Sequence, residues 1–534
     1  MSQLTDELNH NAVEFEAVLG LFDSCGPTLL SYPRSIRVTN LQGSSQYDDL
    51  DNKIKSESWA HIFPLNYDVL FGTKVLVVGN VDDQMVESAT LAHEAHHLLN
   101  LCSSPVGHLL HMNQIRMTVL FLAFLKSINE DGRLRKIRFP LSEFLCCAKS
   151  DDETTRIVKR FLTHVVSPFV ALQQSLLGKL EISECEVENL LKNSDNVINH
   201  FQKWYMDLDS LASSSLGRNL DMVKKILPGP PIKIRSCGVY LELGALQIAE
   251  CFARMGEAHW VSLMRKIVRR NRDKTALDKR LDDCLSLNSK QTIRYLAPFH
   301  IVANKWGDGN PMLAMFCCWM AMLAPVDPRT LPLVRKYQLE WDDLHPGHRF
   351  IKIIESIADI RPNLPKINQD WKTFAGDLYD MVAERLQWPN FNELAEAMSK
   401  PDHSEKYFHI ENQRDPFLII YERINKARQE VPWCEAIPGN ELVTEDPLII
   451  PVIYSDGRLS ISNHPNGFSG YLHYVASRIA EWCIFGNTGE KLHILFTQEE
   501  LFKKACFHLC GMEFDFLNEL FLNSWRITNF SRGT

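Results

Sequence analysis

Residues 90–99 read TLAHEAHHLL, and this stretch contains the pattern His-Glu-x-x-His at His93, Glu94 and His97. Residues four positions apart lie on the same face of a helix, so both imidazoles can bind one metal ion. The glutamate beside the first histidine can then act as a general base toward a water molecule on that metal. The sequence therefore predicts a metal centre built on a helix.

The flanking residues favour a helix with one apolar and one polar face. Asp82 and Asp83 provide an N-terminal cap, and the stretch Ser103-Ser104-Pro105 ends the helix. Between them, apolar residues recur at helical spacing, whereas both histidines lie on the neighbouring stripe. The segment before the helix, residues 72–79, is rich in valine and reads as a strand.

The pattern at His93, Glu94 and His97 resembles the active-site helix of the zincin metallopeptidases. In the gluzincin branch of that family, the third metal ligand is a glutamate in a Glu-x-x-Ala helix. Residues 250–253, Glu-Cys-Phe-Ala, fit that second pattern, with cysteine where such helices often have glycine. The resemblance implies that His93, His97 and Glu250 bind Zn2+, which leaves one position open. It also implies that Glu94 activates the water molecule that attacks a peptide carbonyl.

Glu250 lies in a helix that we expect to begin near residue 237 and to end near residue 270. Its sequence neighbours are apolar, and burying an unpaired carboxylate is costly. A metal ion is one partner for it, and Arg254 or Lys266 is another. Glu257 lies two turns further along the same stripe, where it can hydrogen-bond a ligating histidine or replace Glu250 as the ligand. The sequence leaves the choice between the two carboxylates open.

Three other interpretations remain open. His96 lies three residues after His93 and can replace His97 as a ligand. A di-iron helical bundle uses Glu-x-x-His pairs on two long helices; Glu94 and His97 form one pair, and residues 490–493 form another between a turn and a strand. A non-catalytic helical interaction protein, or scaffold, would contain the histidine pattern by coincidence.

The composition and several sequence signals limit the expected location and the expected partners of the protein. A net charge of −9 and a pI near 6.1 argue against a general nucleic-acid binder. The N-terminus lacks a basic region followed by an apolar run, so we expect no signal peptide. The most apolar stretches, residues 117–125 and 312–324, are too short to span a bilayer. The 14 cysteines lie largely in apolar runs, which is typical of reduced thiols. We therefore expect a cytoplasmic protein with a protein or peptide substrate, no nucleic-acid or membrane partner, and room for a regulatory protein partner.

The chain is too long for one hydrophobic core. We expect a mainly α fold with a small N-terminal strand region, a zincin-like catalytic core and an α+β C-terminal part. Strand patterns at 448–454 and 492–496, and a turn that suggests a hairpin with residues 459–461, predict the last of these. The expected divisions are a zincin-like region with a helical insertion (1–270), a helical domain (271–435) and an α+β domain (436–534).

Overall fold

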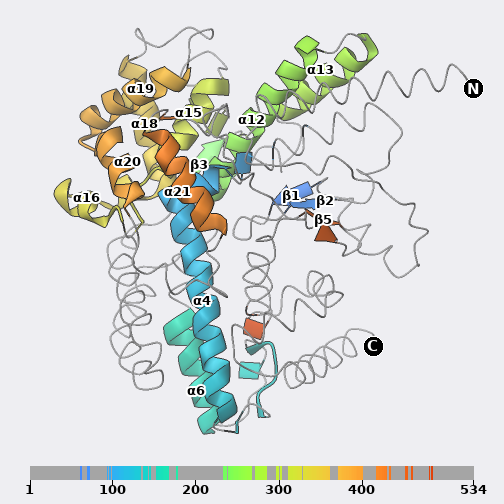
Figure 1. Ribbon diagram of the computed structural model, residues 1–534, viewed down its shortest axis with the longest axis vertical. Coiled ribbons are helices and arrows are strands. Elements are labelled where there is room, and N and C mark those ends of the chain that lie inside the picture. Colours follow the sequence, from blue (N-terminus) through green and yellow to red (C-terminus); the bar gives the residue numbers. More distant parts are fainter. Residues whose placement is uncertain are drawn as a thin grey trace, which may run out of the picture.

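The computed structural model describes residues 60–62, 69–71, 89–145, 152–166, 176–177, 232–267, 271–285, 296–302, 311–360, 371–400, 416–433, 452–454, 459–460 and 480–484, with short gaps inside several of these ranges. This part of the chain is mostly helical, as the sequence predicted (Figure 1). The strands predicted at 72–79 and 492–496 lie outside the described residues.

The described α-helices are α4 (Pro105–Glu130), α6 (Glu153–Phe161), α12 (Ala245–Ile267), α13 (Asn271–Leu285), α15 (Pro311–Met322), α16 (Leu331–Lys336), α17 (Trp341–Leu344), α18 (Pro346–Ile360), α19 (Trp371–Leu386), α20 (Phe391–Ser399) and α21 (Pro416–Arg428). A short π-helix, η3 (Leu162–Val166), follows α6. None of the described helices combines the length and the apolar character that crossing a bilayer requires.

α15 is buried along almost its whole length. Its sequence, PMLAMFCCWMAM, is apolar on every side, which is typical of a helix that is packed all round. α12 and α18 pack against it, and Trp319 on α15 contacts the rings of Tyr379, Phe391 and Trp433. The resulting core contains residues from Leu101 to Trp433, and so from both sides of residue 270. This core supports the helix that carries Glu250.

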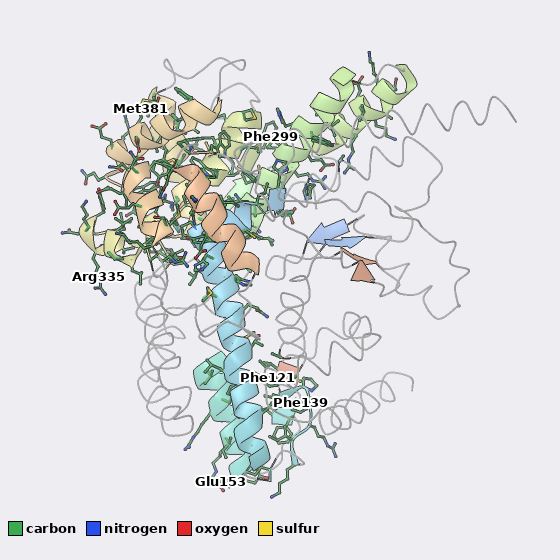
Figure 2. The ribbon with its side chains drawn as sticks, viewed as in Figure 1. Phe121, Phe139, Glu153, Phe299, Arg335 and Met381 are labelled. Atoms are coloured by element: carbon green, nitrogen blue, oxygen red, sulfur yellow. The ribbon has the colours of Figure 1, made fainter. Side chains whose placement is uncertain are left out.

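α4 extends away from this core and ends beside α6 (Figure 2). Phe121 on α4 contacts Phe139 and Phe161. Phe124, also on α4, stacks on Phe161 with the ring centroids 4.0 Å apart. All four aromatic side chains are buried. The far end of α4 therefore has a small aromatic core of its own.

The described part of the chain also contains short strands (Figure 1). β1 (Ala60–Ile62), β2 (Val69–Phe71), β5 (Val452–Tyr454) and β6 (Leu459–Ser460) form a sheet in the order β1-β2-β5-β6, with β2 parallel to β5. β3 (Ile232–Ser236) and β4 (Val239–Leu243) form an antiparallel pair before α12. Most of residues 436–534 lies outside the described part of the chain, so the α+β character of this region stays a prediction.

α12 begins later than the sequence suggested. A helix was expected from about residue 237, but residues 239–243 form β4 and the helix starts at Ala245. Valine and tyrosine at the start of that stretch favour a strand. Gly244 separates the two elements, and its backbone N–H donates a hydrogen bond to Gln247 Oε1 at 3.0 Å. That bond satisfies a backbone donor at the N-terminus of α12. Because the helix starts at Ala245, Glu250 lies in its second turn.

A buried polar cluster joins the start of α4 to α21 and to the segment after α15. His108 on α4 pairs through Nδ1 with the Asp327 carboxylate, and its ring stacks on Tyr421 of α21 with centroids 4.4 Å apart. Tyr421 donates a hydrogen bond to Asp327 Oδ2 at 3.3 Å, and the backbone N–H of Arg329 donates to Oδ1 at 2.7 Å. Both paired side chains are fully buried. The hydrogen bonds from Tyr421 and Arg329 replace the water that the Asp327 carboxylate has lost.

Arg428, at the end of α21, lies beside this cluster. Its Nη1 donates to the Ser103 carbonyl oxygen and, at 2.9 Å, to Asn425 Oδ1. The side chain is fully buried. Ser103 ends the helical segment that contains His93 and His97. α21 therefore holds the C-terminal end of the segment that carries both histidines.

The buried pair of His108 and Asp327 should make the free energy of unfolding depend on pH. Burial raises the pKa of this carboxyl group, but His108 and Arg329 lower it to about 2, below its usual value of 3.8. Its contribution is therefore present above about pH 4 and is lost as the pH falls through about 2. We expect Asp327→Asn to lower the free energy of unfolding by about 3 kcal/mol at neutral pH, because His108 loses its buried partner. Urea unfolding at a series of pH values measures both effects.

Glu396→Gln is the control for this experiment. The Glu396 side chain is 73% exposed and pairs with Lys400 within one helical turn. Exposed ion pairs contribute little to stability, so this change should leave unfolding nearly unaltered. If both variants behave alike, the buried pair does not stabilise the fold.

Candidate metal centre

His93 and His97 lie one helical turn apart and are both buried. Their Nε2 atoms are 3.1 Å apart, and the two rings are nearly perpendicular, with an interplanar angle of 87°. Two neutral imidazoles with adjacent Nε2 atoms present their lone pairs to the same small volume. The pair can therefore supply two ligands to one metal ion.

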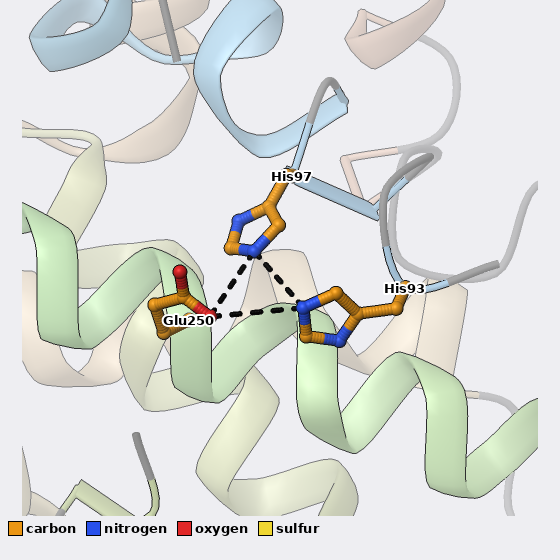
Figure 3. A group of neighbouring side chains, drawn as sticks. All are labelled: His93, His97 and Glu250. Carbon is orange, nitrogen blue, oxygen red and sulfur yellow. Dashed lines mark hydrogen bonds and ion pairs between the residues drawn. The ribbon is translucent and has the colours of Figure 1, made fainter. Parts of the chain in front are cut away.

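Glu250, on α12, faces both histidines (Figure 3). Its Oε2 lies 3.6 Å from His93 Nε2 and 3.3 Å from His97 Nε2. The Glu250 side chain is 19% exposed, compared with 10% for His93 and 8% for His97. In the described part of the chain, this is the one group of three histidine, cysteine or acidic residues that could hold a metal ion.

The size of this triangle can be compared with the spacing of ligand atoms around one metal ion. Its edges measure 3.1, 3.3 and 3.6 Å. A tetrahedral ion with bonds of about 2.0–2.1 Å separates its ligand atoms by about 3.3 Å, whereas an octahedral ion with similar bonds separates adjacent ligands by about 2.9 Å. Two nitrogen atoms and one carboxylate oxygen at these spacings are close enough together to bind one metal ion, and their mean spacing is nearer to the tetrahedral value.

The charge on Glu250 suits a metal ligand. Burial raises the pKa of its carboxyl group, but the nearby His97 and His93 side chains lower that pKa well below its usual range. The group is therefore ionised at neutral pH. Because a carboxylate must lose its proton before it binds a metal, this ligand is already in the required state.

Glu257 contacts the opposite side of His93. Its Oε2 lies 3.3 Å from His93 Nδ1, and its side chain is fully buried. Arg254 pairs with Glu257 at 2.8 Å. A carboxylate at Nδ1 favours the tautomer in which Nε2 carries the lone pair. The geometry thus distinguishes the two carboxylates, with Glu250 in the triangle and Glu257 behind it.

His96 packs against α12 instead of joining the triangle. A Cβ atom at Gly256 would lie 2.4 Å from His96 Cδ2, and the Phe252 ring centroid is 5.9 Å from that of His96. The histidine ring therefore occupies the space above Gly256. Glycine lowers helix stability by about 1 kcal/mol relative to alanine. A glycine inside a helical pattern could therefore have indicated this close approach from the sequence alone.

Some residues singled out in the sequence remain without a described position. Glu94 and the pair at 490–493 lie outside the described residues. Sequence reasoning missed Arg280 on α13, which pairs with Glu257. The sequence of α13 did not indicate this contact, because the helix is rich in charged residues and nothing in its sequence distinguishes Arg280 from the others.

Comparisons of the chain with protein-family models, with curated proteins and with solved structures found no match.

Gly256→Ala tests the contact between the histidine segment and α12. Alanine is the better helix former, so any loss of stability reports the overlap with His96. We expect the free energy of unfolding to fall by about 1–3 kcal/mol, measured by chemical denaturation. Adding His96→Ala should recover part of this loss, because the smaller side chain leaves room for the new methyl group. A more stable Gly256→Ala variant would contradict the close approach.

Proposed function

We propose that the protein is a zinc-dependent peptidase that acts in the cytoplasm. The observation that supports this most is the ligand triangle of His93, His97 and Glu250, whose edges match a tetrahedral ion. Two of its members belong to the His-Glu-x-x-His pattern, in which the glutamate serves as a general base. The third comes from the Glu-x-x-Ala segment, which resembles the gluzincin ligand helix.

Each residue has one task in this proposal. His93, His97 and Glu250 hold the zinc ion, and Glu257 orients the His93 ring from behind. Glu94 accepts a proton from the water molecule that attacks the peptide carbonyl. When bound, zinc activates that water molecule and polarises the carbonyl group.

The other parts of the chain serve recognition and control in this proposal. Residues 1–270 form a zincin-like catalytic region with a helical insertion, and an N-terminal strand offers an edge for an extended peptide. Residues 271–435 and the α+β region 436–534 recognise a protein or peptide substrate or a regulatory protein partner. The net charge of −9 supports a protein partner over nucleic acid.

Metal content is the first test. Purified protein should contain about one zinc ion per chain, measured by elemental mass spectrometry after dialysis. His93→Ala, His97→Ala and Glu250→Ala should each lose the ion, because each removes one side of the triangle. His348→Ala is the matched control, since this partly buried histidine pairs with Asp342 and is not one of the three residues of the triangle. One iron per chain would favour an oxygen-activating centre with the same ligand types, and two would favour the di-iron interpretation.

Glu94→Gln separates a peptidase from a scaffold with a structural metal. Glutamine keeps the shape of the side chain but cannot accept the proton. We expect this variant to fold and retain zinc while peptide cleavage falls by about 10²–10⁴-fold. Mass spectrometry of new peptide N-termini in cell extracts, with wild type and variant compared, measures the cleavage. Unchanged cleavage in Glu94→Gln, together with unfolding of His93→Ala, would mean that the metal is structural.

A further inference from the structure

Glu257 joins the candidate metal centre to a second helix, α13. We propose that Arg280 on α13 is a positioning residue for the centre, acting through Glu257 on His93. The contact between α13 and α12 thereby regulates how tightly the centre holds its metal. This inference rests on the proposed zinc site but not on the peptidase reaction.

Glu257 is the shared member of three contacts. Its Oε2 lies 3.3 Å from His93 Nδ1 and 2.8 Å from Arg254 Nη1. Its other oxygen, Oε1, pairs with Arg280 Nη2. The carboxylate is fully buried, whereas the arginine side chains are 24% and 21% exposed. Glu257 therefore lies between the metal ligand and two cations at the edge of the centre.

The two arginines do not have equivalent positions. Arg254 precedes Glu257 by three residues on the same helix, so α12 alone brings them together. Arg280 comes from α13, which packs along α12 as the second arm of a helical hairpin (Figure 1). Its contact with Glu257 exists only while the two helices are packed together. Of the residues that contact Glu257, Arg280 is thus the one whose contact depends on the position of α13.

The physical effect of Arg280 is to fix the rotation of the Glu257 carboxylate. Cations on opposite oxygens hold both ends of the group, which leaves Oε2 directed at His93. Without Arg280, the buried carboxylate has one arginine left, and we expect it to turn toward Arg254. The 3.3 Å contact of Oε2 with His93 Nδ1 then lengthens, and His93 becomes a less well oriented ligand. Outer partners of this kind change metal affinity by about 10–100-fold.

The test compares Arg280→Met with Lys279→Met on the full-length protein. Lys279 is the preceding residue on α13 and is exposed, so its replacement removes the same charge from the same helix. We expect Arg280→Met to raise the zinc dissociation constant by about tenfold, measured by competition with a chromophoric chelator at fixed pH. Lys279→Met should leave it unchanged. Arg280→Lys should recover part of the affinity, since it keeps the charge but not the planar fork.

A double variant tests whether Arg280 acts through Glu257. In a Glu257→Gln background, Arg280→Met should have no further effect on zinc affinity, because the group it orients has lost its charge. Cobalt(II) bound in place of zinc provides a second readout, since its visible spectrum should change in Arg280→Met but not in Lys279→Met. These comparisons use only variants that retain the wild-type circular dichroism, and Arg280→Lys replaces Arg280→Met if the latter unfolds.

The outcomes separate this inference from the proposed function. Equal zinc affinity in wild type, Arg280→Met and Arg280→Lys would overturn the role of Arg280 while leaving the metal site in place. Additive losses in the double variant would also overturn it. Normal zinc binding with no cleavage in any assay would overturn the peptidase but not the inference. A wild-type chain that binds no zinc or cobalt would overturn both.

Discussion

The candidate centre depends on how closely the segment around His93 and His97 approaches α12. His93 lies between two carboxylates of that helix, with Nε2 toward Glu250 and Nδ1 toward Glu257. Gly256 permits this separation, because any larger side chain would overlap the neighbouring histidine ring. Metal sites tolerate errors of only about 0.2 Å in their bonds. A small displacement between the two segments would therefore abolish the ligand triangle.

The position of α12 is set by packing on its other side. Cys251 follows Glu250 and contacts Cys318 on α15, inside the apolar core. Burial raises the pKa of the Cys317 and Cys318 thiols well above their usual value, so both stay protonated and serve as packing residues. α12 thus has one face in a close-packed core and another that carries charged groups. Because close-packed cores resist small displacements, the core holds α12 in place, and with it Glu250 and Glu257.

Local patterns in the sequence predicted more of the site than of its surroundings. Helical periodicity was enough to place His93 beside His97, and the Glu-x-x-Ala segment pointed to Glu250. Helical periodicity alone did not separate Glu250 from Glu257, since seven residues along a helix return to the same stripe; only the resemblance favoured Glu250. Arg280 could not be predicted either, because it joins the cluster only through the packing of two helices. The predicted start of α12 was wrong, because the residues before Gly244 form a strand.

The buried cluster at His108 has a consequence for the order of synthesis. The residues of the ligand triangle are all made by position 250, whereas Asp327, Tyr421 and Arg428 emerge from the ribosome much later. Until then, the His108 side chain and the Ser103 carbonyl group lack the partners that permit their burial. The contacts of Asp327, Tyr421 and Arg428 with this part of the chain can therefore form only when α21 has been translated. A nascent chain would complete this cluster only after most of the surrounding protein already exists.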